Sequence, residues 1–229
     1  MIANKKLFFT GFVLLAGFLT ILFIMFTPIF GGGQNALNFL DNLYNSISKG
    51  SAYYIQDLKS QNQTFVGREI DVTIKITSAD QVQNTAILFW KAGAAARAEG
   101  ETLSVKGDIG NILAASLETA NLMFYNNAET VRDTYGYDAR QALYNWWAAL
   151  KTINKELTRQ KHFEEAKFVG SVETKALECA YNYYGVVPQH IGDKVLIVIF
   201  SLVFYVLYTL WFGYAIMFLF EGWGMDLAH

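Results

Sequence analysis

The first candidates for chemistry are a histidine and a glutamate three positions apart. On a helix, His162 and Glu165 would lie on one side, where imidazole and carboxylate can both ligate a metal ion. Two ligands do not complete a site, and the surrounding segment HFEEAK has the composition of an ordinary solvated helix face. His190, two residues after Pro188, could ligate haem only with an axial partner from elsewhere. The sequence therefore predicts no metal site and no cofactor.

The remaining polar motifs are equally incomplete. Asp71 and Asp108 could approach each other across paired strands, but both occupy polar positions of alternating segments, so we expect them to be solvated. The turn Gly107–Gly110 lacks the lysine and hydroxyl residue of a phosphate-binding loop. No nucleophile elbow, dinucleotide fingerprint or zinc-protease motif is present. We therefore expect a protein without a catalytic site, which is not an enzyme.

The single cysteine limits the kinds of covalent and metal site that the chain can form. One cysteine excludes an internal disulfide framework, a cysteine-rich zinc site and a covalently attached c-type haem. Cys179 lies between Ala176 and Ala180 in a predicted helix with many apolar neighbours. A buried thiol is the favoured interpretation, and an intermolecular disulfide is the alternative.

Composition indicates a membrane protein with a folded polar part. Of the 229 residues, 53% are hydrophobic and only 17% are charged, against roughly 25% charged in soluble domains. The formal net charge of −2 gives no support to nucleic-acid binding.

Two uncharged segments account for this composition. Residues 7–30 follow the basic pair Lys5 and Lys6, and residues 195–220 form a second segment near the C-terminus. Each exceeds the roughly 20 apolar residues that span a bilayer. A cleaved signal peptide is the alternative for the first, but its apolar region would be only about 7–15 residues long.

The basic N-terminal pair predicts the topology, because positive charge favours the cytoplasmic side. We expect a two-pass protein of a cell membrane, with the bacterial inner membrane as the favoured location. The expected parts are a cytoplasmic N-terminus (1–6), a transmembrane helix (7–30), an extracytoplasmic domain (31–194), a second transmembrane helix (195–220) and a short cytoplasmic tail (221–229).

The apolar segments contain no ionisable side chain, which argues against a transporter or channel acting alone. Small and polar residues of the first segment fall toward one side at helical spacing, and such residues allow close helix packing. These candidate partner-binding residues are Thr10, Gly17 and Thr20.

The intervening chain predicts an α+β domain. A helix is expected over 35–58, weakened near 49–51, and a half-buried strand over 70–77, where apolar and polar residues alternate. Ser78 and Gln81 fit a capping box for the next helix. A hairpin centred on residues 99–100 and a helix over 109–125 complete a small β-α-β-β-α unit; a helix running to Arg97 is the alternative to the hairpin.

Two further helices, from Asp138 to about 157 and over 163–184, carry the aromatic residues. Trp146 fits an apolar stripe with Leu143 and Leu150, whereas Trp147 and Tyr144 lie beside that stripe. We expect Trp146 to be structural and the other two to face a partner, since tryptophan and tyrosine are favoured interface anchors. A small-ligand pocket is the alternative.

These observations predict a non-catalytic accessory or structural subunit of a larger membrane complex, with a bacterial energy-converting complex as the favoured setting. Its expected partners are other membrane protein subunits, or further copies of itself, together with the lipid bilayer. The alternative is an extracytoplasmic ligand-binding or sensor module that signals through a separate partner.

Overall fold

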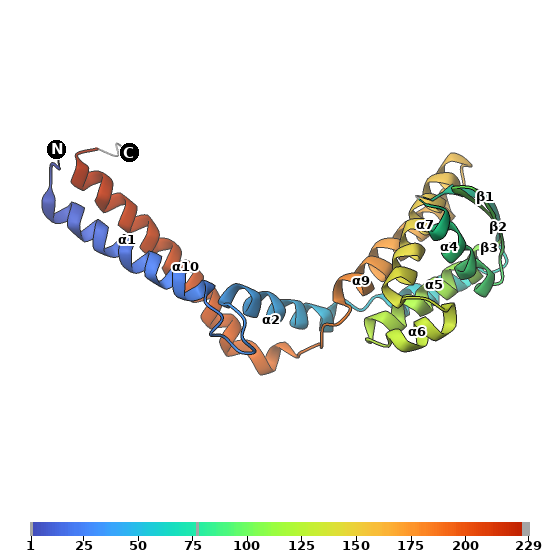
Figure 1. Cartoon of the computed structure of the whole chain (residues 1–229), viewed down its shortest axis with the longest axis horizontal. Helices are drawn as coiled ribbons and strands as arrows, with labels where there is room; N and C mark the ends of the chain where they lie inside the picture. The colour runs from blue at the N-terminus through green and yellow to red at the C-terminus, as the bar shows by residue number, and fades with distance from the viewer. Residues whose placement is uncertain (1, 77, 226–229) are drawn as a thin grey trace. The chain divides into compact units, whose positions relative to one another are not determined.

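The computed structural model describes residues 2–76 and 78–225, which fold into two compact units. Unit 1 consists of Met1–Gly50 and Pro188–His229, and unit 2 consists of Ser51–Val187 (Figure 1). The fold is α+β, and the domain expected over 31–194 contributes its first helix to unit 1 rather than to the compact unit 2.

Two long helices of unit 1 lie side by side (Figure 1). They are α1 (Lys5–Phe26) and α10 (Ile191–Trp223), and both are long and apolar enough to cross a membrane. Contacts join the start of α1 to the end of α10, so the two helices are antiparallel. The two predicted apolar helices are present.

Their bounds differ from the predicted ones. The first helix ends at Phe26 instead of residue 30, because Pro28 has no amide hydrogen and disfavours helical backbone at Thr27, whose φ and ψ are −78° and 147°. The second helix extends beyond 195–220 at both ends. His190 caps its start by accepting a hydrogen bond from the Gly192 amide at 3.1 Å, and Gly224, with φ of +88°, ends it.

Glycines bring the backbones of the two helices together. A Cβ atom at Gly11 would lie 2.6 Å from the Leu219 nitrogen, and one at Gly222 would overlap the backbone of Phe8. Side chains of α10 also donate to α1 carbonyls: the Tyr208 hydroxyl to Phe18 at 2.8 Å, and the Trp211 indole to Leu14 at 2.9 Å. The pair is thus held by close packing and by hydrogen bonds.

The helix expected over 35–58 is interrupted. Unit 1 contains α2 (Ala36–Ser51), whose first turn is capped by Asn35, and unit 2 begins with α3 (Ile55–Asn62). The interruption at 52–54 follows the predicted weak point by a few residues.

Unit 2 contains a three-stranded antiparallel sheet in the order β1-β3-β2. The strands are β1 (Glu69–Lys75), β2 (Ala95–Glu99) and β3 (Thr102–Asp108). In β1 the isoleucines and Val72 are buried, while Asp71, Thr73 and Lys75 are exposed. The predicted strand and its facing are confirmed; Thr77, its expected last residue, lies outside the described residues.

The predicted order β-α-β-β-α is also confirmed. Helix α4 (Ala79–Lys91) begins at Ser78, whose hydroxyl accepts a hydrogen bond from the Gln81 amide at 3.4 Å. The Gln81 side chain donates to Asn145 instead of returning to Ser78, so only half of the capping box forms. The hairpin turns at residues 100–101, where Gly100 has a φ of +61°, and the alternative helix to Arg97 is wrong.

Helices cover one face of the sheet and enclose the core of unit 2 (Figure 1). Their bounds are η1 (Gln63–Phe65, a 3₁₀ turn), α5 (Ile109–Phe124), α6 (Ala128–Tyr135), α7 (Ala139–Arg159), α8 (Phe163–Val172), η2 (Glu173–Glu178, a π-helical turn) and α9 (Cys179–Tyr183). Asp138 caps α7 as expected, accepting from the Gln141 amide at 2.9 Å.

Candidate functional site

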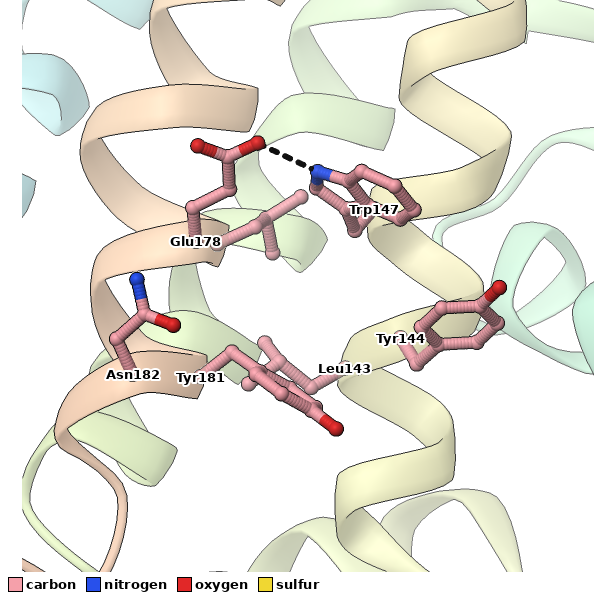
Figure 2. A pocket seen from close by; sticks show the side chains of 7 residues that line it. Leu143, Tyr144, Trp147, Glu178, Tyr181 and Asn182 are labelled. Atoms are coloured by element: carbon pink, nitrogen blue, oxygen red, sulfur yellow. Dashed lines mark hydrogen bonds between the residues drawn. The ribbon is translucent and has the colours of Figure 1, made fainter.

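An open groove between α7 and the η2–α9 segment is the candidate site of unit 2 (Figure 2). Its volume is about 290 Å³, and apolar side chains form most of its lining. The lining residues are Leu143, Tyr144, Trp147, Leu177, Glu178, Tyr181 and Asn182. Both partner-binding candidates of the predicted aromatic helix lie in this groove.

The neighbouring tryptophan has a different role. Trp146 is 0% exposed, packs edge-on against Phe89 with ring centroids 5.3 Å apart, and donates its indole N–H to the Tyr135 hydroxyl at 3.4 Å. Successive helical residues point about 100° apart, so a buried Trp146 directs Trp147 sideways. The prediction that Trp146 belongs to the core is confirmed.

Trp147 forms one wall of the groove and is half-buried. Its indole N–H donates to Glu178 Oε1 at 2.9 Å (Figure 2). The Lys151 ammonium lies 4.3 Å from its ring centre. The Tyr144 ring lies 5.6 Å away and is 42% exposed. The protein itself therefore covers part of Trp147, whereas Tyr144 is available at the surface.

A π-helical turn forms the opposite wall. The helix predicted over 163–184 is continuous, but residues 173–178 adopt π-helical hydrogen bonding, which often occurs at functional sites. This turn supplies Leu177 to the floor and Glu178 to the rim. Sequence periodicity gave no signal for it.

A second carboxyl group lies in the same turn. Burial raises the pKa of Glu173, and the nearby Lys151 and Lys155 act in the opposite direction. The protonated form of Glu173 is thus favoured over a wider pH range than that of an exposed glutamate.

The remaining rim is aromatic and polar. Tyr181 is exposed, and the Arg140 guanidinium lies 5.2 Å from its ring centre. Asn182 adds an amide on the α9 side (Figure 2). An apolar floor with aromatic walls and a polar rim is typical of surfaces that hold a protruding apolar group.

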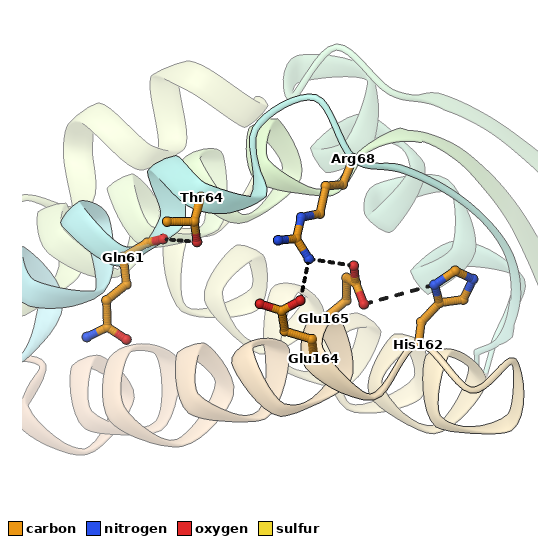
Figure 3. A network of polar contacts seen from close by, with 6 residues as sticks. All are labelled: Gln61, Thr64, Arg68, His162, Glu164 and Glu165. Atoms are coloured by element: carbon orange, nitrogen blue, oxygen red, sulfur yellow. Dashed lines mark hydrogen bonds and ion pairs between the residues drawn. The ribbon is translucent and has the colours of Figure 1, made fainter.

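The histidine–glutamate pair belongs to an ion-pair network rather than to this groove (Figure 3). Arg68 donates to Glu164 at 2.8 Å and to Glu165 at 2.9 Å, and His162 Nδ1 lies 4.0 Å from Glu165. The hydrogen bond from Arg68 lowers the pKa of Glu165, which keeps this carboxylate ionised and engaged. Within residues 2–76 and 78–225, no three His, Cys, Asp or Glu side chains are arranged to hold a metal ion.

The two aspartates that the sequence suggested as a pair lie apart from each other. Asp71 and Asp108 do not meet across the strands: Asp71 is opposite Lys106, and Asp108 is opposite Glu69. Asp108 is also not merely solvated, since its carboxylate accepts from the amides of Gly110 and Gly67, both at 2.8 Å. This capping role follows from its position just before α5.

Cys179 is partly buried, and its thiol donates to the Ala52 carbonyl at 3.2 Å.

The candidate residues of the first apolar helix differ in their contacts. Gly17 faces α10, where a Cβ atom would lie 3.0 Å from the Trp211 ring. Thr10 and Thr20 are exposed and donate to the carbonyls of Lys6 and Ala16 in their own helix. Gly11, which was not among the predicted residues, also lies against the α10 backbone, where a Cβ atom would be 2.6 Å from the Leu219 nitrogen.

Comparison of this chain with protein-family models, with curated proteins and with solved structures gives no match. The groove and the apolar helix pair are the features of the molecule that bear on its function.

Proposed function

We propose that this protein is a non-catalytic accessory subunit of a larger membrane complex, bound to another membrane subunit through the groove of unit 2. The observation that carries this proposal is the surface-accessible Tyr144 beside Trp147, above an apolar floor. Aromatic residues in such a setting are the usual anchors of protein interfaces. The helix pair α1–α10 would hold the subunit in the bilayer.

The proposed topology places both termini in the cytoplasm of a bacterial cell and unit 2 outside it. Lys5 and Lys6 precede the first apolar helix, and unit 2 is long enough to be translocated despite its charges. A reporter that is active only in the cytoplasm is expected to be active at residues 1 and 229 and silent at residue 100. Activity at residue 100 would contradict the orientation.

The proposed occupant of the groove is an apolar side chain that protrudes from a partner subunit. Leu143 and Leu177 form a buried apolar floor, and the rings of Tyr144, Trp147 and Tyr181 supply the accessible apolar surface above it. Glu178 and Asn182 at the rim can bond to the backbone of the partner segment. Glu178 Oε1 already accepts from Trp147, which fixes the indole ring in place before any partner binds. Such preorganisation lowers the entropic cost of association.

Truncation of the exposed aromatic residue tests this contact. Tyr144→Ala is expected to leave the fold intact and to weaken partner binding about tenfold or more, as loss of an interface anchor does. The measurement is the yield of co-purified subunits from membranes solubilised in mild detergent. Trp147→Ala is expected to have the same effect, with a small loss of stability because Trp147 also packs against the core.

Phe163→Ala is the matched control, since this aromatic residue is 62% exposed and does not line the groove. Equal recovery of partner subunits with Tyr144→Ala, Trp147→Ala and Phe163→Ala would contradict the proposal.

A ligand-binding role is the second candidate, favoured by the aromatic walls and by a volume near the lower end of small-molecule sites, roughly 300 Å³. The same purification distinguishes the two: a stably bound subunit supports the accessory role, and a lone protein carrying a bound small molecule supports the ligand-binding role.

A further inference from the structure

A second cavity lies within unit 1, apart from the groove of unit 2. It has a volume of about 240 Å³ and lies between α2, the turn that precedes it and the first turns of α10. Its lining residues are Gly31, Gln34, Phe39, Asn42, Leu43, Gln189, Lys194 and Ile197. None of these described residues is acidic.

The cavity carries a positive charge that the protein does not neutralise. Lys194 is half-buried, and among the described residues, 2–76 and 78–225, no carboxylate lies within ion-pair distance of its ammonium. Among the described residues, Lys59, Lys75 and Lys106 have such partners. A half-buried cation without a carboxylate partner favours an anionic ligand.

Amide groups provide further donors around this charge. Gln34 Oε1 accepts a hydrogen bond from Asn42 at 3.0 Å, which orients the Gln34 side chain and leaves its NH₂ group as a donor. The volume is several times the roughly 30 Å³ that one water molecule occupies, so a phosphate group fits. Cation and amide donors together match the oxygens of a phosphate.

The apolar surface of the helix pair begins next to this cavity. Lys194 directly precedes Val195, the first of the 26 uncharged residues, and Leu196 and Phe200 are strongly exposed in the following turns. Phe39 and Ile197 line the cavity on its apolar side. A phosphate held here would have an apolar helix surface beside it, along which acyl chains can lie.

Helix α2 also carries an apolar stripe that is partly exposed. Leu37 is 47% exposed and lies on a stripe of α2 with Leu40, Tyr44 and Ile47; the Tyr44 ring is partly exposed, and its hydroxyl forms a hydrogen bond with the Ser201 hydroxyl of α10 at 2.6 Å. An apolar stripe on a helix next to the end of a membrane span is typical of helices that lie in the headgroup region.

We infer that this cavity binds the headgroup of an anionic phospholipid, with the phosphate at Lys194 and the amides and the acyl chains along α10. The inference rests on the membrane insertion that the proposed function includes. A free phosphate ion shares the headgroup chemistry, and the exposed apolar surface beside the cavity favours the lipid.

Lipid retention by the purified full-length protein tests the inference. The protein in mild detergent is titrated with phosphatidylglycerol or with phosphatidylcholine of the same acyl chains, and bound lipid is counted by native mass spectrometry. The wild type is expected to retain one phosphatidylglycerol at about fivefold lower lipid concentration than phosphatidylcholine. This factor corresponds to the ~1 kcal/mol that one lysine contributes near an anionic membrane surface.

Three variants complete the test. Lys194→Gln is expected to lose the fivefold preference, Lys194→Arg to keep it, and the control Lys6→Gln, at the other end of the helix pair, to keep it as well. An unchanged preference in Lys194→Gln would overturn the inference, and so would complete displacement of the lipid by millimolar inorganic phosphate.

Resistance to carbonate extraction is measured on the same variants. If the wild-type protein resists carbonate extraction but shows no lipid preference, only the lipid site is refuted. If carbonate extracts the wild-type protein, the membrane-bound function on which the site depends is refuted.

Discussion

Trp146→Ala is expected to destabilise unit 2 by about 3–5 kcal/mol, because truncation of a fully buried tryptophan leaves a large cavity. The variant also loses the edge-on contact with Phe89 and leaves the Tyr135 hydroxyl without the indole N–H. For a unit of this size the melting temperature should fall by roughly 10–20 °C. Thermal unfolding of the full chain, followed by circular dichroism, measures the change.

Trp147→Ala is the internal comparison, since it removes the same side chain from the adjacent position. Its half-buried ring predicts a clearly smaller fall in melting temperature. Equal destabilisation by the two variants would mean that the second side of α7 is as structural as the first, and the argument for the groove as a docking surface would lose its main support.

Val72→Asp is expected to prevent unit 2 from folding. Val72 is 1% exposed and opposite Val105 in the register of β1 and β3. An unpaired carboxylate at this position costs several kcal/mol by order of magnitude, a large share of the stability of a typical domain. Circular dichroism and limited proteolysis of the full chain are expected to show loss of the fold.

The neighbouring Thr73→Asp change places the same carboxylate on the other face of the strand. Thr73 is exposed and opposite Ser104, so this variant should melt within a few degrees of the wild type. If both aspartate variants behaved alike, the alternation of burial in β1 would be incorrect.

Local patterns predicted most of the elements. Alternation from Ile70 identified the first strand and its buried face, and Ser78 and Asp138 marked helix starts because their side chains cap the first amides. The three-residue spacing of Leu143 and Trp146 was enough to separate the buried tryptophan from Trp147. In each case the physical cause lies within a few residues of chain.

The unpredicted features depend on residues far apart in the sequence. The groove requires Glu178 from a π-helical turn, and π-helical hydrogen bonding has no periodic signature in a segment of six residues. The lipid cavity combines Gln34 and Asn42 with Lys194, which only tertiary structure brings together. Helical spacing also did not separate Gly11, which contacts α10, from Thr10, which bonds to its own helix.

The antiparallel pairing of α1 with α10 has a consequence for the order of events during synthesis. The Tyr208 hydroxyl and its acceptor, the Phe18 carbonyl, are 190 residues apart in sequence, and the whole of unit 2 is made between them. At about 5–20 residues per second, the ribosome takes about 10–40 s to cover that distance. Small domains fold within seconds, so unit 2 can fold while α1 still has no partner helix. The helix pair is then the last part of the protein to assemble, and α1 spends this interval with its Gly11 face uncovered.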